Sequence, residues 1–253
     1  MILKSSILGR GPVIIILHGL FGESNNWKGV SSKLLNYFEI HLVDQRNHGN
    51  SFHHKQQNYK VMALDLKNYI EKKKINTFSI IGHSMGGKVA MQFAFLYPKG
   101  LDKLIIIDIS PREYQDNHTD VFLGLKQVLL ESKSRQSAQK ILMSHINNEV
   151  KSNFLLKGLF FTSTQRPHLK FNLVAIQKNS HNMLSSLHSD ILFDGKTYFL
   201  SGANSNYIQR RDIKYISQLF SLYKIIEIKN AGHWIHYDNK SDFLKTIGQI
   251  FNL

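Results

Sequence analysis

A serine between an expected strand and an expected helix is the sharpest chemical signal in the chain. Residues 82–87 read GHSMGG, a G-x-S-x-G pattern in which Ser84 is the central residue. The apolar run 78–81 before it predicts a buried strand, and the residues after it have helical spacing. A turn this sharp exposes a hydroxyl above the sheet edge, beside a helix N-terminus that favours negative charge. We therefore predict that Ser84 is a nucleophile, with a purely structural turn as the alternative.

A glycine-containing loop, HGLFG at 18–22, follows a second apolar run at 13–17. In this position a loop can point a backbone N–H across the sheet edge towards the serine. Together with the N–H of Met85 it would hold the oxyanion that forms during acyl transfer. We assign this donor to Leu20, with Phe21 as the neighbour that could serve instead. A plain glycine-rich turn is the other interpretation.

A general base must come from one of 13 histidines, and position decides between them. His233 lies in the sequence AGHW, after the last expected strand at 225–228, where its side chain can reach the same sheet edge as Ser84. It also completes the chain order serine, acid, histidine. We therefore predict that His233 is the base. The other histidines are expected to be loop or supporting residues (His18, His48, His83, His236) or solvated surface residues (His53, His54, His181).

The acid is the hardest member to place, because the loop after the strand expected at 197–200 reads SGANSNY and contains no carboxylate. Asp108 ends the strand next to that of the nucleophile, so it is our predicted acid; it would orient the imidazole and stabilise the imidazolium. Asp212 would serve if its loop folded back. Ser205 would add a hydrogen bond to the pair formed by Asp108 and His233.

Metal and redox chemistry find little support in the sequence. The chain has no cysteine, which removes disulfides, thiolate zinc sites, iron–sulfur clusters and a cysteine nucleophile. It also lacks HExxH or a similar spacing of metal ligands. We expect no metal and no organic cofactor.

The charge balance raises the question of an acidic partner. The 253 residues include 32 Lys and Arg against 18 Asp and Glu, a net charge of +14. Lysine dominates this excess, with 25 Lys to 7 Arg, whereas phosphate recognition favours the bidentate arginine. We therefore expect no nucleic-acid partner. The first residues lack the apolar core of a signal peptide, and no stretch approaches a membrane span, so we expect a soluble, cytoplasmic protein.

Alternating apolar runs and helical patterns set the fold class. Continuously apolar runs are typical of strands buried on both faces, and helices between them imply right-handed crossovers. We predict an α/β fold with a doubly wound, mostly parallel sheet. The expected strands are 13–17, 40–43, 78–81, 104–107, 197–200 and 225–228, with helices at 61–74 and 85–97.

The alternation stops between residues 111 and 190, where we find helical patterns at 121–130 and 138–146 and no convincing strand. We interpret this segment as a helical cap inserted over one edge of the sheet, with a separately folding domain as the alternative. The chain would then be one domain, 1–253, with a core of 1–110 and 191–253 and a closing amphipathic helix at 243–251.

Taken together, these motifs resemble the α/β-hydrolase fold serine esterases, and within them the small bacterial YbfF-type acyl-CoA esterases. The resemblance covers nearly the whole chain: HGLFG, DQRNHGNS at 44–51, IGHSMGGK at 81–88, IDISP at 107–111, FNL at 171–173, GANSNY at 202–207 and AGHWIH at 231–236. It implies Ser84 as nucleophile, Asp108 as acid, His233 as base and Ser205 as an auxiliary residue. It also implies activity on acyl-CoA thioesters and simple esters. The chain departs from the family in lacking a proline after Ser205 and in carrying more Lys and Asn in the insertion.

Other functions of the same fold remain alternatives. These are a carboxylesterase acting on an acyl methyl ester bound to a carrier protein, a carbon–carbon bond hydrolase and a non-catalytic binding protein. Dehalogenases are excluded, because they need a carboxylate where Ser84 stands.

The insertion supplies candidates for substrate contacts. Its apolar residues would line an acyl pocket, although packing into a core is the commoner use of such residues: Phe122, Leu123, Phe154, Phe160 and Phe161. Its basic residues would dock an acidic acyl carrier protein or the phosphates of coenzyme A, with a solvated helix face as the alternative: Lys126, Lys133, Arg135, Lys140, Lys151 and Lys157.

Overall fold

The computed structural model describes residues 1–116 and 118–253 and contains a seven-stranded sheet in the order β1-β3-β2-β4-β5-β8-β9. Every neighbouring pair is parallel except β1 and β3. This confirms the predicted α/β class with a mostly parallel sheet. The strands are β1 Lys4–Gly9, β2 Val13–Leu17, β3 Glu39–Asp44, β4 Phe78–His83, β5 Leu101–Ile107, β8 Lys196–Gly202 and β9 Tyr223–Ile228.

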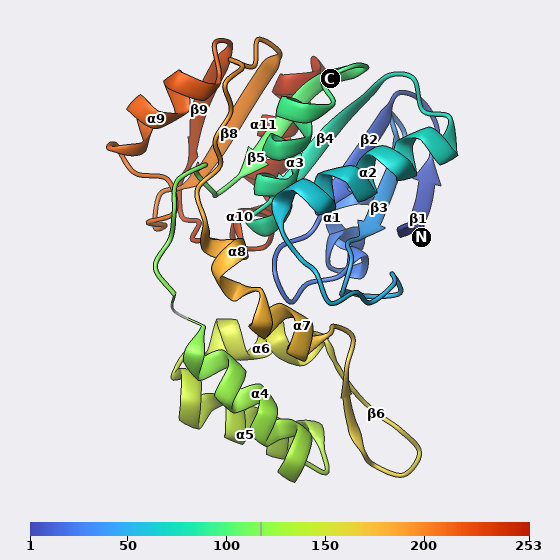
Figure 1. Cartoon of the computed structure of the whole chain (residues 1–253), viewed down its shortest axis with the longest axis vertical. Helices are drawn as coiled ribbons and strands as arrows, with labels where there is room; N and C mark the ends of the chain where they lie inside the picture. Colours follow the sequence, from blue (N-terminus) through green and yellow to red (C-terminus); the bar gives the residue numbers. More distant parts are fainter. Residues whose placement is uncertain (117) are drawn as a thin grey trace.

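Two helical layers bury the sheet, as Figure 1 shows with α2 and α3 in front of it and α11 behind. Successive strand residues point to opposite faces, so Ile15 and Leu17 pack in one layer while Ile14 and Ile16 pack in the other. This explains the continuous apolar runs. The first layer contains α2 Tyr59–Lys73, α3 Met85–Leu96 and α9 Asp212–Leu219, and the second contains α1 Lys28–Ser31, α10 Ile235–Asp238 and α11 Lys240–Phe251.

The edge strand β1 was absent from the sequence prediction. It pairs antiparallel with β3, from Lys4 opposite Asp44 to Gly9 opposite Glu39. Its sequence, KSSILG, is exposed or half-buried throughout, because an edge strand is only partly covered. A search for continuous apolar runs does not detect such a strand.

The segment between β5 and β8 forms a layer of helices beneath the sheet, with α4, α5 and α6 furthest from the core and α7 and α8 nearer to it (Figure 1). Its elements are α4 Thr119–Glu131, α5 Arg135–Ile146, α6 Glu149–Lys157, β6 Leu159–Phe161, β7 Pro167–Leu169, α7 Leu173–Lys178 and α8 Ser180–Leu184. Asn117, which the predicted cap includes, lies outside the described residues. We call residues 111–190 the cap, and this division of the chain remains our proposal.

The expectation that the cap contains no strand was wrong. Strands β6 and β7 form an antiparallel hairpin, with Leu159 opposite Leu169 and Phe161 opposite Pro167. Each strand has three residues, and only Leu159 among them is buried. Such a short and exposed hairpin has neither the length nor the alternation that identifies a strand in a sequence.

The loop that follows β3 attaches the cap to the core. The N–H of Gly49 donates to the carbonyl of Lys170 at 2.7 Å, and the N–H of Asn172 donates to the carbonyl of Asn47 at 2.8 Å. The cap has its own apolar cluster, into which Phe21 from the core inserts. Among the described residues, no helix is long and apolar enough to span a membrane.

Candidate active site

Ser84 is the single residue between β4 and α3, and its backbone is strained. Its φ of 52° and ψ of −118° lie in a region that residues with a side chain rarely adopt. A Cβ on Gly82 would lie 2.4 Å from the carbonyl oxygen of Gly86, and one on Gly86 would lie 2.5 Å from that of Leu17. The close backbone approach therefore requires glycine on both sides of the serine, as the pattern predicts.

Two free backbone donors lie beside Ser84. In the described part of the chain, the N–H groups of Leu20 and Met85 have no hydrogen-bond partner. Both residues line the same cavity as Ser84. The N–H of Phe21, the alternative donor, is engaged by Nε2 of His48 at 3.2 Å. This arrangement favours Leu20 over Phe21 as the partner of Met85.

Phe21 instead links the core to the cap. Its φ of 62° turns the chain, and its buried ring contacts Phe122 and Phe171, with ring centroids 5.9 and 5.2 Å away. The loop that contains Leu20 is therefore held in place by contacts with cap residues.

Asp108 and His233 meet at this edge of the sheet. Nδ1 of His233 lies 2.8 Å from Oδ2 of Asp108, whose side chain is fully buried. The N–H of Gly202 donates to the other carboxylate oxygen at 3.0 Å, and the hydroxyl of Ser205 donates to Oδ2. The ring of Tyr207 stacks on the imidazole at 3.8 Å. With Nδ1–H held by Asp108, Nε2 of His233 is the nitrogen left to accept a proton.

Asp212, the alternative acid, has other partners. Its carboxylate pairs with Arg112 at 3.1 Å and accepts the N–H of Gln209 at 2.9 Å, at the start of α9. The structure therefore brings Asp108, and not Asp212, to the imidazole of His233.

Two further histidines near the site are held neutral. His18 has Nδ1 at 2.8 Å from the carbonyl of Gly19, while its Nε2 accepts the N–H of Gln45 at 3.1 Å. His48 has Nδ1 at 2.9 Å from the carbonyl of Arg46. Burial lowers the pKa of His18 and lowers that of His48 to about 3, with the neighbouring His18 adding to the shift. Both rings fix loop geometry, as expected of supporting residues.

His83 and His236 are two further histidines close to His233. Nε2 of His83 donates to the carbonyl of His233 at 2.8 Å and so fixes the loop that carries the base. His236 stacks on Trp27 with centroids 4.0 Å apart. Burial lowers the pKa of His83 and lowers that of His236 to about 3, and the nearby His233 contributes to both shifts. Neither ring therefore competes with His233 for a proton near neutral pH.

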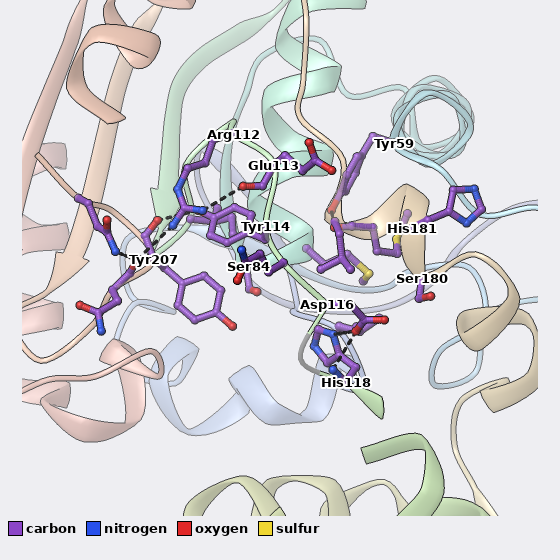
Figure 2. A pocket seen from close by; sticks show the side chains of 18 of the residues that line it. Tyr59, Ser84, Arg112, Glu113, Tyr114, Asp116, His118, Ser180, His181 and Tyr207 are labelled. Carbon is purple, nitrogen blue, oxygen red and sulfur yellow. Dashed lines mark hydrogen bonds and ion pairs between the residues drawn. The ribbon is translucent and has the colours of Figure 1, made fainter. Parts of the chain in front are cut away.

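A cavity of about 1090 Å³ opens in front of Ser84. Figure 2 shows Ser84 near its centre, with Tyr59 and His181 on one side, Arg112 and Tyr207 on the other, and His118 towards the cap. The lining is partly apolar and aromatic and partly polar. We call the apolar and aromatic part the wall and the polar part the polar end, and the two meet where Arg112 lies over the ring of Tyr114. The wall includes Tyr59, Ile109, Tyr114, Met183 and Leu184, and the polar end includes Arg112, Glu113, Asn206, Gln209 and Arg211.

Most of the predicted acyl-pocket residues lie elsewhere. Phe122 lines the cavity, but Leu123 and Phe160 are 49% and 44% exposed. Phe154 contacts Trp234, and Phe161 packs against the apolar cluster of the cap. The sequence showed that these residues are apolar and lie in the insertion, but it could not show which of them turn towards the serine.

The wall residues that sequence reasoning missed come from three separated segments: the start of α2, the connection after β5 and the end of α8. No motif joins these segments.

Of the histidines predicted to lie on the surface, His53 is exposed and His54 is half-buried. His181 is also exposed, but it borders the cavity. Among the described residues, no group of three or more possible metal ligands occurs.

The sheet order and the strained serine at the mouth of a cavity define a hydrolase of the alpha/beta fold. The family described as alpha/beta hydrolase fold matches residues 12–240, and the chain belongs to it. The chain is 32% identical to Esterase YbfF of Escherichia coli, over 94% of this chain and 92% of that protein. It is 31% identical to the sn-1-specific diacylglycerol lipase ABHD11 of Xenopus tropicalis, over 94% and 77%. A solved marine microorganism esterase superimposes with a TM-score of 0.94 at 35% identity, covering 98% of both chains. These similarities confirm the predicted family and support an esterase or lipase activity.

Proposed function

We propose that the protein is a serine esterase or thioesterase that hydrolyses acyl esters or acyl-CoA thioesters through Ser84, His233 and Asp108. The observation that carries the proposal is the hydrogen bond between buried Asp108 and His233, at the sheet edge where strained Ser84 faces the cavity. Ester hydrolysis needs a nucleophile, a base and an orienting acid, and these three residues have the required types and chain order.

In the first step, Nε2 of His233 takes the proton of the Ser84 hydroxyl as its oxygen attacks the acyl carbonyl. The N–H groups of Leu20 and Met85 hold the oxyanion, and one such donor contributes about 2.7–4 kcal/mol. His233 then returns the proton to the leaving alcohol or thiol. Water, deprotonated by the same imidazole, attacks the acyl-enzyme and releases the acid, so one difficult step becomes two easier ones.

Asp108 acts through His233. Its carboxylate fixes the tautomer and stabilises the positive imidazole that forms in both steps. The N–H of Gly202 and the hydroxyl of Ser205 hold the carboxylate in place. Ser205 is therefore an auxiliary residue that orients the acid.

The thioester substrate is the finer part of the proposal. The polar end of the cavity, with Arg112 and Arg211, suits a polar leaving group, and the apolar wall suits an acyl chain. Five of the six basic cap residues named above are exposed and Lys151 is half-buried, so they are available to the phosphates of coenzyme A or to an acyl carrier protein. A methyl ester carried on that protein is the alternative substrate.

The test is hydrolysis of matched acyl-CoA and p-nitrophenyl ester series by the wild type and by Ser84→Ala, with a serine-directed phosphonate as a label. We expect turnover and labelling in the wild type and neither in Ser84→Ala. A folded wild type that is inert and unlabelled would instead indicate a binding protein. Activity on esters without activity on any thioester would remove the acyl-CoA assignment alone.

A further inference from the structure

Lys88 is buried, which is exceptional for a lysine. It lies on α3, four residues after Ser84, and is 1% exposed. Its Nζ donates to the carbonyl oxygens of Arg112 at 2.7 Å, Ser185 at 2.6 Å and Leu184 at 3.5 Å. An ammonium has three donors, so these contacts satisfy it completely.

The three carbonyls belong to the two connections between the core and the cap. Arg112 lies on the connection that leaves β5, and Leu184 and Ser185 end α8 on the connection that returns. The two connections also bond to each other, through the N–H of Tyr114 and the carbonyl of Leu184 at 2.9 Å. One side chain of the nucleophile helix therefore holds both connections together.

The contacts of Lys88 also form the back of the cavity wall. Its Nζ lies 5.5 and 4.9 Å from the ring centroids of Tyr59 and Tyr114, within cation–π range. The hydroxyl of Tyr59 donates to the carbonyl of Met183 at 2.5 Å. Figure 2 shows Tyr59 and Tyr114 on the side of Ser84 away from His118. Tyr59, Tyr114, Met183 and Leu184 all line the cavity, whereas Lys88 lies behind them.

We infer that Lys88 is a positioning residue that sets acyl-group specificity, because its ammonium holds the two cap connections and the wall against which the acyl group lies. The inference rests on the proposed esterase function. Without the ammonium, three partly buried carbonyls would lose a charged donor, and the wall would relax to recover other partners. Among the described residues, the ammonium of Lys88 donates to these carbonyls and not to the side chain of Ser84, so we expect the effect to fall on the acyl chain.

Burial and the neighbouring charges make the contacts of the Lys88 ammonium sensitive to pH. The guanidinium of Arg112 lies over the ring of Tyr114, 3.9 Å from its centroid, and pairs with Asp212. Burial lowers the pKa of Lys88 to about 7, with Arg112 adding to the shift and the carboxylate of Glu113 opposing it. Burial also raises the pKa values of Tyr59 and Tyr114, so both stay neutral. Above neutral pH the amine keeps only two donors for three carbonyls.

The experiment compares Lys88→Met with Lys60→Met, which makes the same change on an exposed position of α2. kcat and KM are measured for p-nitrophenyl esters from acetyl to decanoyl, together with the rate at which a small phosphonate labels Ser84. In Lys88→Met we expect KM for the preferred chain to rise roughly tenfold, the scale on which a hydrophobic pocket discriminates chains. We expect acetyl turnover and labelling to stay near those of the wild type. Lys88→Arg should restore part of the preference, and Lys60→Met should resemble the wild type.

An unchanged chain-length profile in folded Lys88→Met would overturn the inference, and so would an equal loss of kcat on every ester. If Lys88→Met does not fold, the wild type provides the test through the ratio of decanoyl to acetyl kcat/KM at pH 6 and pH 9. Any group that acts on both esters alike cancels in this ratio, so we expect it to fall as Lys88 is neutralised, and a constant ratio would contradict us. An inert wild type would refute the esterase proposal instead. Hydrogen exchange at the N–H of Tyr114, which bonds to the carbonyl of Leu184, would still test the link between the two connections: we expect faster exchange in Lys88→Met than in Lys60→Met, and equal rates would contradict us.

Discussion

The sheet edge that carries the proposed reacting groups and the cavity wall proposed to face the acyl group are held by different contacts. At the edge, Ser84 and Asp108 each follow the end of a strand directly, and both have positive φ values set by the adjoining backbone. At the wall, residues from distant segments are held by side chains that donate to backbone carbonyls, with buried Lys88 and Tyr59 among them. The chemistry is thus fixed by short local sequences and the specificity by long-range contacts. Mutations at the edge should therefore change the rate on every substrate, and mutations at the wall should change the preference between substrates.

The largest effect should come from the acid at the sheet edge. In Asp108→Asn the imidazole loses the carboxylate that sets its tautomer, so we expect kcat to fall about 10⁴-fold. Asp212→Asn, a matched change away from the imidazole, should lose the Arg112 pair but retain turnover within about tenfold. Steady-state kinetics on one ester measures both. The reverse order would assign the acid to Asp212.

Ser205 should have a smaller effect at the same edge. Ser205→Ala removes one hydrogen bond to the charged carboxylate of Asp108, while the N–H of Gly202 remains. A hydrogen bond to a charged group contributes about 1.5–3 kcal/mol, so we expect kcat/KM to fall about 10–100-fold. Ser221→Ala is the control, because this exposed serine precedes β9, at the opposite end of that strand from His233. Full activity in Ser205→Ala would remove the auxiliary role.

These edge residues are the part of the site that the sequence could predict. GHSMGG, HGLFG and AGHW each place a residue type beside the end of a strand, and parallel strands bring those ends together. The cap wall could not be predicted in this way. Tyr59, Tyr114 and Leu184 are distant in sequence and meet only after the cap has folded over the sheet. The sequence analysis missed the edge strand β1 and the β6–β7 hairpin because both contain few buried apolar residues.

Lys88 lies where the two regions meet, and its titration should change the stability of the protein. The pKa of Lys88 is about 7 in the folded protein and 10.5 when unfolded, so the unfolded chain binds more protons between these values. The stability of the wild type relative to Lys88→Met should therefore rise from pH 6.5 to pH 9, by about 2–3 kcal/mol. Urea unfolding of both proteins at the two pH values measures this difference. A constant difference would show that Lys88 does not titrate in this range.

The smallest effect should come from the outer face of the cap. If its basic residues dock the phosphates of coenzyme A, raising the salt concentration should lower kcat/KM for an acyl-CoA several-fold, because exposed charges are screened. A neutral p-nitrophenyl ester with the same acyl group should be unaffected. If kcat/KM for the two substrates responds equally to salt, these residues form a solvated surface and do not dock the substrate.

The most direct test of the whole account is to trap the acyl-enzyme. The protein is mixed with a p-nitrophenyl ester, quenched in acid and examined by mass spectrometry, with Ser84→Ala treated in parallel. We predict that the wild type gains the mass of one acyl group, that the peptide containing Ser84 carries it, and that Ser84→Ala gains nothing. Turnover of the ester by Ser84→Ala, or an adduct on another residue of an active wild type, would contradict the account.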